Sequence, residues 1–340
     1  MKKALITIIQ VLVTLGLLWF VFRDPETRKN VAETLPNAHP GWLMLAFLTF
    51  GGLCITGIVR WKILMAVQGI RLNTGRIGAL FLIGHFFSQF LPGSTGGDIL
   101  KIYYVMKETK TKKAAAFLSV LVDRMIGLVA LMIVGAVLLG MRYQWLTQTT
   151  GARNLVYILI LVLVGCLGVI VFAWLVTSFG FVHKLPQWFP LRTLWIELAE
   201  AYTIYGKAWK STLAALCLGM LGHLCIFTSF YFGARAYTSK VGIVDFFSTL
   251  PIVNTITSLP ISVAGLGARE AMFEELLGKL CNLPKEAVSI SLTCYFIMLG
   301  WGIVGGIIYV FYRSSSQGPS LKEVREEMDM EHIGESFEKD

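Results

Sequence analysis

Long apolar runs are the feature that most constrains this chain. Stretches of roughly 20 residues with almost no charge recur along its 340 residues, and about 20 apolar residues in a helix are enough to cross the hydrocarbon core of a bilayer. A spanning segment must satisfy its backbone hydrogen bonds internally, so each run is expected to be a helix. The six runs are 4–22, 41–59, 114–139, 155–179, 211–234 and 287–311.

The composition agrees with an all-α polytopic membrane protein. Hydrophobic residues make up 55% of the chain and charged residues 15%, whereas soluble domains carry about 25% charged residues. This excludes an ordinary soluble, disordered or fibrous protein. The net charge of +9 is spread over short loops between the apolar runs, so no nucleic-acid partner is expected.

Two further apolar segments, 77–91 and 246–259, are too short to cross comfortably as single helices. Each ends in a Gly/Pro-rich break, at 92–98 and at 260–270. Such breaks survive at membrane depth only where protein or a wet cavity covers the freed backbone groups. We expect two re-entrant helical hairpins. The alternative is that both segments span fully, which gives eight helices.

The order of these elements predicts an inverted repeat. The first series is 41–59, the break at Pro92 and 114–139, and the second is 211–234, the break at Pro260 and 287–311. The two hairpins then enter from opposite sides, as in many alternating-access carriers. We expect one transmembrane domain over 1–313, with halves of about 1–142 and 143–313, and an acidic cytoplasmic tail over 314–340.

Charge predicts the orientation. With a cytoplasmic N-terminus and re-entrant hairpins, 19 of the 30 Lys and Arg residues lie on the cytoplasmic side and ten lie outside, which favours cytoplasmic N- and C-termini in the cell (inner or plasma) membrane. The run 4–22 is long for a signal peptide and lacks a small-residue cleavage site, so we expect it to stay uncleaved. Segment 185–209 is expected to be an amphipathic surface helix.

The first break carries a candidate anion site. Gly96 and Gly97 free the backbone to present N–H groups, which attract anions such as a lipid phosphate. Asp98 is expected to cap the following helix, to pair with Lys101 or Arg60, or to receive a cationic headgroup. Arg60 is either an interface anchor or a headgroup contact. A capped turn without a ligand is the structural alternative.

The second break carries Gly265, Gly267, Arg269 and Glu270. Arginine makes forked hydrogen bonds to phosphate or carboxylate. The structural alternative is that Arg269 pairs with Glu270 or with Asp98 and fastens the two halves together.

Asp123 and Arg124 lie within a predicted span, where ionisable residues are costly and usually face the protein interior. Adjacent helical positions point about 100° apart, so each is expected to find a partner elsewhere. Arg60 or Lys101 is the candidate for Asp123. Glu270 or a bound phosphate is the candidate for Arg124. A purely structural role stays open.

Enzyme signatures are missing from the sequence. It has no P-loop, GxSxG, HExxH or dinucleotide fingerprint, and its six cysteines form no CxxC motif. We therefore expect no catalytic residue, no metal and no cofactor. His85 and His223 lie in apolar segments, where they either carry protons or hydrogen-bond a neighbouring helix.

Several motifs together resemble a known family. They are RWK at 60–62, FLPGSTGGDILKIYYV at 90–105, VDRMIGL at 122–128, LPISVAGLGARE at 259–270 and GGIIYV at 305–310. This order is similar to the lysylphosphatidylglycerol synthase transmembrane-region family, or flippase-like domain proteins. Members that make lysyl-phosphatidylglycerol carry a large C-terminal aminoacyl-transferase domain. Here the sequence ends with a 28-residue tail, Arg313–Asp340, so we expect no aminoacylation of lipids.

Lys101 departs from the pattern of the family, in which an arginine often follows the GGD motif. It keeps the positive charge but loses the forked geometry. The family's stand-alone proteins are linked to lipid translocation and to hopanoid and polyisoprenyl-linked sugar pathways, so the resemblance does not fix the lipid.

The leading hypothesis is a membrane protein that binds a phosphate-bearing lipid, a phospholipid or polyisoprenyl phosphate, and moves it between leaflets. A membrane-embedded transferase or transferase subunit, and a scaffold for envelope-lipid synthesis, are the alternatives. Envelope-lipid enzymes and a second copy of the chain are candidate partners. The predicted lipid-binding residues are Arg60, Gly96, Gly97, Asp98, Lys101, Asp123, Arg124, Gly265, Gly267, Arg269 and Glu270.

Overall fold

The computed structural model describes residues 2–90, 96–108, 113–178, 192–258 and 262–312, and within these ranges all regular structure is helical. Five helices are long and apolar enough to cross a membrane, which confirms the predicted polytopic α-helical class. They are α3 (Pro40–Val67), α6 (Lys113–Leu146), α7 (Thr150–Ser178), α9 (Trp209–Arg235) and α12 (Ala287–Tyr312). Several continue past the predicted runs, because a helix does not end where its apolar stretch ends.

The predicted run 4–22 forms α1 (Lys2–Phe22), and a short polar helix, α2 (Pro25–Thr34), follows it. Asp24 caps α2 by accepting hydrogen bonds from the backbone N–H groups of Glu26 and Thr27, each at 3.2 Å. Pro25 fits the first helical position, where no N–H is needed. A 3₁₀ turn, η1 (Leu35–Asn37), leads into α3.

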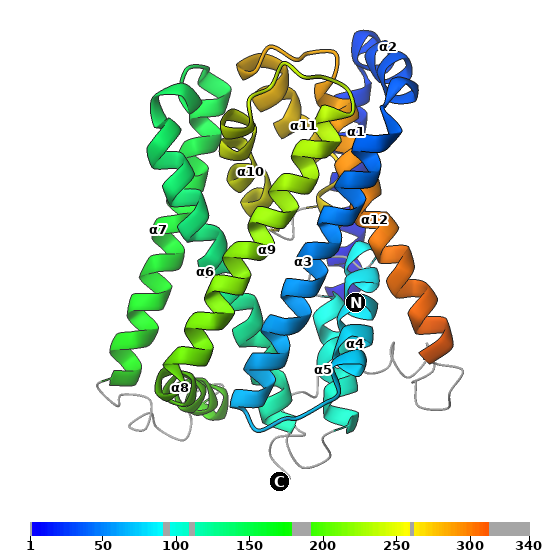
Figure 1. Cartoon of the computed structure of the whole chain (residues 1–340). Helices are drawn as coiled ribbons and strands as arrows, with labels where there is room; N and C mark the ends of the chain where they lie inside the picture. Colours follow the sequence, from blue (N-terminus) through cyan, green and yellow to red (C-terminus); the bar gives the residue numbers. More distant parts are fainter. Residues whose placement is uncertain (1, 91–95, 109–112, 179–191, 259–261, 313–340) are drawn as a thin grey trace.

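The two short apolar segments form helical hairpins. The first consists of α4 (Thr74–Phe90) and α5 (Gly96–Glu108). The second consists of α10 (Ile243–Ser258), a 3₁₀ turn η3 (Val263–Gly265), α11 (Ala268–Phe273) and a π-helix η4 (Glu274–Leu280). The parts of the predicted breaks at 91–95 and 259–261 lie outside the described residues. Figure 1 shows the α4–α5 hairpin in the lower half of the molecule and the α10–α11 hairpin in the upper half.

The packing of the helices follows the predicted inverted repeat. Helices α3 and α9, the first of each half, pack against each other. Helix α4 packs along α12, and its counterpart α10 packs along α6, so each hairpin is held by the last helix of the other half. Helix α4 also contacts η3, which brings the hairpins together inside the molecule. Helices α4 and α10, with 17 and 16 residues, are not among the five described helices that are long and apolar enough to cross a membrane, which favours hairpins over eight full spans.

Glycines permit the closest helix contacts. Gly97 lies against the backbone of Gly84, so a Cβ atom at 97 would collide with the Gly84 carbonyl group. Gly305 of α12 lies against the carbonyl oxygen of Leu82 in the same way. Because small residues let helix backbones approach closely in a membrane, these contacts fix α5 and α12 on α4.

The predicted surface helix is α8 (Arg192–Lys207), which lies across the lower end of the molecule in Figure 1 and contacts α6, α7 and α9. Residues 185–191 of the prediction lie outside the described residues. Tyr205 is buried, and its hydroxyl donates to the Leu64 carbonyl oxygen at 3.0 Å. Tyr202 and Ile204 are exposed, so the helix has one face on the bundle and one face outward.

Candidate functional site

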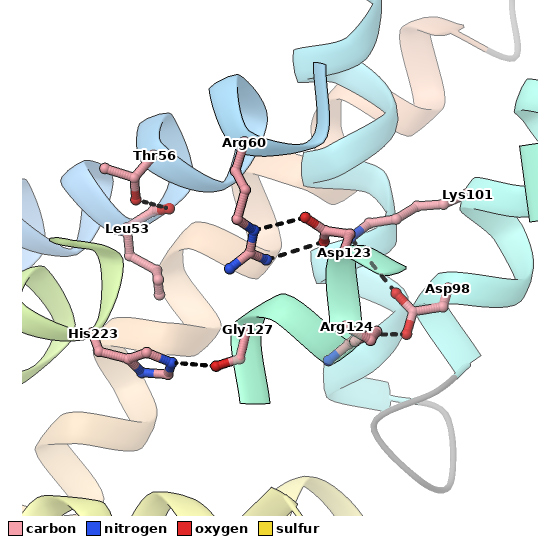
Figure 2. A network of polar contacts seen from close by, with 9 residues as sticks. All are labelled: Leu53, Thr56, Arg60, Asp98, Lys101, Asp123, Arg124, Gly127 and His223. Atoms are coloured by element: carbon pink, nitrogen blue, oxygen red, sulfur yellow. Dashed lines mark hydrogen bonds and ion pairs between the residues drawn. The ribbon is translucent and has the colours of Figure 1, made fainter. Parts of the chain in front are cut away.

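Five charged side chains that lie far apart in the sequence come together in the first half of the molecule (Figure 2). They belong to three helices, α3, α5 and α6. All five were predicted as site residues from their positions in apolar segments or breaks. We call them the charged network: Arg60, Asp98, Lys101, Asp123 and Arg124.

Arg60 and Asp123 form a two-point ion pair. The Nε of Arg60 donates to Oδ1 of Asp123 at 2.7 Å, and Nη2 donates to Oδ2 at 3.0 Å. The side chains are only 15% and 6% exposed. The guanidinium lies beside Gly127 and Gly219, where a Cβ atom would come within 3.2 and 3.4 Å of its Nη1. The prediction that Asp123 pairs with Arg60 or Lys101 is thus resolved in favour of Arg60.

Asp98 is the centre of the other half of the network. Its carboxylate forms an ion pair with Arg124 and lies 3.6 Å from the Nζ of Lys101. Helix α5 begins at Gly96, so Asp98 lies inside the first helical turn and not at the cap. The predicted pairing of Arg124 with Glu270 is wrong, because α5 brings Asp98 to α6 whereas Glu270 belongs to the second hairpin.

Lys101 is buried although it carries a charge. Its Nζ lies 4.4 Å from the centroid of the Phe81 ring and 5.5 Å from that of Trp61. Aromatic faces attract cations, most strongly where water is excluded. The two rings and Asp98 therefore offset part of the desolvation cost of the ammonium group.

The charged network carries an excess of one positive charge, since three cations face two carboxylates. The side chains of the network differ in solvent exposure. The side chains of Asp98 and Lys101 are about 10% exposed, whereas that of Arg124 is 45% exposed. The Arg124 guanidinium thus lies at the exposed edge of a buried charge cluster, where charge-assisted hydrogen bonds and the net charge both favour an anion.

The second hairpin uses its carboxylate differently. Glu270 is fully buried, and its Oε2 accepts from the Gly267 N–H at 2.5 Å while its Oε1 accepts from the Ser291 hydroxyl at 2.9 Å. The first bond is half of a capping box at the start of α11. Gly265 and Gly267 have φ of 74° and 80°, a backbone conformation that favours glycine. Glu270 therefore fastens the turn.

Arg269 forms neither of the predicted ion pairs, with Glu270 or with Asp98, because the Glu270 carboxylate is turned to Gly267 and Ser291. The Arg269 Nη2 donates to the carbonyl oxygen of Ala264 at 3.2 Å, and its guanidinium lies 5.9 Å from the centroid of the Tyr295 ring. The side chain is buried, and its Nη1 has no hydrogen-bond partner among the described residues.

Both predicted intramembrane histidines contact a neighbouring helix. The Nε2 of His85 lies 3.3 Å from the Met298 carbonyl oxygen of α12. The Nε2 of His223 lies 3.0 Å from the Gly127 carbonyl oxygen of α6 (Figure 2). A carbonyl oxygen only accepts, so each Nε2 is the donor.

Like Gly219 and Phe81, Gly127 is a contact of the charged network that the sequence analysis did not predict. It follows Asp123 by four positions and therefore lies on the same helix face. That spacing is the signal from which its place beside Arg60 was predictable. Within the described ranges, no group of three or more His, Cys, Asp or Glu side chains is placed to hold a metal ion.

Comparisons with known proteins agree with the resemblance. Residues 7–306 match the family described as the lysylphosphatidylglycerol synthase TM region. The chain is also 27% identical over 126 residues to the UPF0104 membrane protein MJ1595 of Methanocaldococcus jannaschii. That match covers 37% of this chain and 36% of the relative, so the chain spans about a third of the curated relative that it matches.

Proposed function

Because the chain belongs to the lysylphosphatidylglycerol synthase TM-region family, a membrane-protein family linked to lipid handling, we propose that it binds the phosphate of a membrane lipid and moves that lipid between leaflets. The observation that carries this proposal is the charged network. Three cations and two carboxylates lie together on α3, α5 and α6, and this excess positive charge suits a lipid phosphodiester.

Arg124 is the proposed primary contact with the phosphate. Its side chain is the most exposed of those that form the network's ion pairs, and its planar guanidinium binds phosphate oxygens in a forked geometry. Lys101 supplies a point charge behind it. Asp98 holds both cations while the site is empty and contacts the positive part of a zwitterionic headgroup when one is present.

The second hairpin is proposed to add one further phosphate contact through Arg269. A guanidinium with an unpaired donor is costly to bury in a membrane protein, and a phosphate oxygen would satisfy that donor. Arg60, Asp123 and Glu270 are proposed to hold the two halves of the site in shape. Gly96, Gly97, Gly265 and Gly267 are proposed to let the backbone turn beside the headgroup.

The proposed setting is the cell membrane, with the N-terminus in the cytoplasm. The distribution of Lys and Arg supports this orientation. It puts the open end of the α4–α5 hairpin on the cytoplasmic side and that of the α10–α11 hairpin on the outer side, so a headgroup reaches the interior from either leaflet.

The test is lipid retention by the purified protein. The full chain is placed in nanodiscs with equal parts of phosphatidylglycerol, phosphatidylcholine and diacylglycerol, then released into detergent for native mass spectrometry. We expect wild type to retain phospholipid and not diacylglycerol, and Arg124→Gln and Arg269→Gln each to retain less. Arg153→Gln is the matched control, because Arg153 is exposed on α7. Equal retention of all three lipids, or by all variants, would overturn the proposal.

A further inference from the structure

Two polar contacts close the two ends of the molecule at equivalent positions of the inverted repeat. Arg142, near the end of α6, forms an ion pair with Asp245, in the first turn of α10; these helix ends lie in the upper part of the molecule in Figure 1. The Nε of Arg76, in the first turn of α4, donates to the hydroxyl of Tyr312, the last residue of α12, at 3.4 Å; these helix ends lie in the lower part of the molecule in Figure 1. We call them the upper latch and the lower latch. Each joins a hairpin to the last helix of the other half.

The sequence positions show that the two latches correspond. Arg76 is the third residue of α4, and Asp245 is the third residue of α10. Arg142 precedes Tyr312 by 170 residues, and Arg76 precedes Asp245 by 169. These offsets are those of the repeat itself. The chemistry differs, since one latch is an ion pair and the other joins an arginine to a phenol, but the place in the fold is the same.

Each latch also has a second contact that keeps it in position. The guanidinium of Arg142 lies 5.3 Å from the centroid of the Trp145 ring. The Tyr312 ring stands perpendicular to that of Tyr104 on α5, with centroids 5.6 Å apart, so Tyr312 touches both legs of its hairpin. Arg142 itself has non-helical φ and ψ of −126° and 18°, which puts a bend in α6 at the upper latch.

We propose that the two latches are reciprocal gates: release of one frees its hairpin and strengthens the closure of the other. Both are closed in this structure. Between the two latches, the halves are connected where α3 packs on α9 and where α4 contacts η3. Movement of one half against the other about this connection opens one end as it closes the opposite end. Both latch contacts are partly exposed. Because exposed polar contacts contribute little stability, each latch can break while the other stays closed.

The proposal goes beyond lipid binding and does not depend on which lipid is carried. Its test is hydrogen–deuterium exchange of the full chain in phosphatidylcholine nanodiscs, read separately for peptides from α4–α5 and from α10–α11. Arg142→Gln is expected to raise amide exchange in α10–α11 at least about fivefold and to lower it in α4–α5, as a coupling between sites requires. Arg76→Gln is expected to do the reverse.

Two further variants distinguish release of a latch from unfolding of the protein. The charge exchange Arg142→Asp with Asp245→Arg restores an ion pair and is expected to return both hairpins to wild-type exchange. Tyr312→Phe keeps the ring against Tyr104 and removes only the hydroxyl, so it is expected to act like Arg76→Gln. Lys279→Gln is the control. It breaks an ion pair with Glu275 that lies within η4 and does not connect the two halves.

Reciprocal changes in the two hairpins, with recovery in the charge exchange, would establish the gates. A rise in amide exchange that is confined to the hairpin whose latch was altered would overturn the proposal, because losing an ordinary structural contact also loosens only the hairpin that it held. No change in either hairpin would also overturn it. Since exchange is read without any transport assay, failure of the latches and failure of the lipid proposal are separate results.

Discussion

Asp98 and Glu270 occupy the same position in the two hairpins, the third residue of α5 and of α11, but they have opposite surroundings. The Asp98 carboxylate faces two cations, Lys101 and Arg124. The Glu270 carboxylate accepts hydrogen bonds from the Gly267 N–H and the Ser291 hydroxyl. The two hairpins therefore place a carboxylate at equivalent positions but surround it with different chemistry, and the first half carries the charged network.

Asp98→Asn is expected to give a less stable but folded protein with changed lipid handling, because Arg124 is 45% exposed and Lys101 keeps its contacts with the Phe81 and Trp61 rings. The substitution removes one negative charge, so the network rises from one excess positive charge to two, and phospholipid should bind more tightly and leave more slowly. Native mass spectrometry is expected to show more retained phosphatidylglycerol, and proteoliposomes a lower transfer rate. Asp24→Asn makes the same charge change at an exposed helix cap, where asparagine also caps, and should alter neither. Wild-type transfer by folded Asp98→Asn would refute this role.

Glu270→Gln is expected to destabilise the protein. The amide oxygen still accepts from the Gly267 N–H, but the NH₂ group then faces Ser291, whose hydroxyl must accept and loses the acceptor of its own buried hydrogen. Such a mismatch costs about 1–3 kcal/mol. Unfolding of the purified protein in mild detergent, with a matched urea series for wild type, measures the difference. Unchanged stability would show that the hydrogen bond from Ser291 is dispensable.

Arg60→Gln should also destabilise, and for a different reason. It strands the buried Asp123 carboxylate, and breaking a buried ion pair from one side costs about 3–5 kcal/mol. Arg60→Gln combined with Asp123→Asn removes both charges and should recover part of the loss. The same unfolding experiment supplies the double-mutant cycle. Additive losses from the two substitutions would mean that the pair seen in Figure 2 contributes no coupling.

Gly97→Ala should loosen the first hairpin, because its methyl group would collide with the backbone of Gly84. Inserting a methyl group into a tight contact typically costs about 1–3 kcal/mol. Gly165→Ala is the control, since no atom outside its own helix backbone lies within 4 Å of a Cβ atom there and alanine favours a helix over glycine by about 1 kcal/mol. Thermal unfolding should therefore separate the two variants. Equal midpoints would contradict the close contact of α4 and α5.

Much of the fold was predictable because hydropathy is periodic over long stretches. The lengths of the apolar runs predicted six spanning helices, of which five are long and apolar enough to cross a membrane among the described residues, while the run 4–22 contributes only a shorter apolar helix, Leu12–Phe22. The Gly/Pro breaks placed both hairpins and so the inverted repeat. Helix α2 was missed, because a polar helix held by the Asp24 cap leaves no trace in hydropathy. The π-helix η4 was missed too, since its sequence resembles an ordinary short helix.

The candidate site was predictable as a set of residues but not as a set of pairs. Charges within apolar runs identified Asp123 and Arg124, and the 100° between adjacent helical positions correctly gave them separate partners. Their partners depend on how helices pack. That is why Arg124, for which Glu270 or a bound phosphate was the candidate partner, is found on Asp98, and why Arg269 pairs with neither Glu270 nor Asp98.

The most direct test of the central claim is the rate at which the protein moves a phosphate-bearing lipid. Full-length protein is reconstituted into liposomes with fluorescent phosphatidylglycerol, and the accessible label is followed with a membrane-impermeant quencher. Wild type is predicted to speed transfer over protein-free liposomes, and Arg124→Gln to slow it about tenfold, the loss expected for one charge-assisted hydrogen bond, while Arg153→Gln leaves the rate unchanged. Equal rates for wild type and a folded Arg124→Gln variant, or no acceleration by wild type, would contradict the proposal that the charged network carries the phosphate.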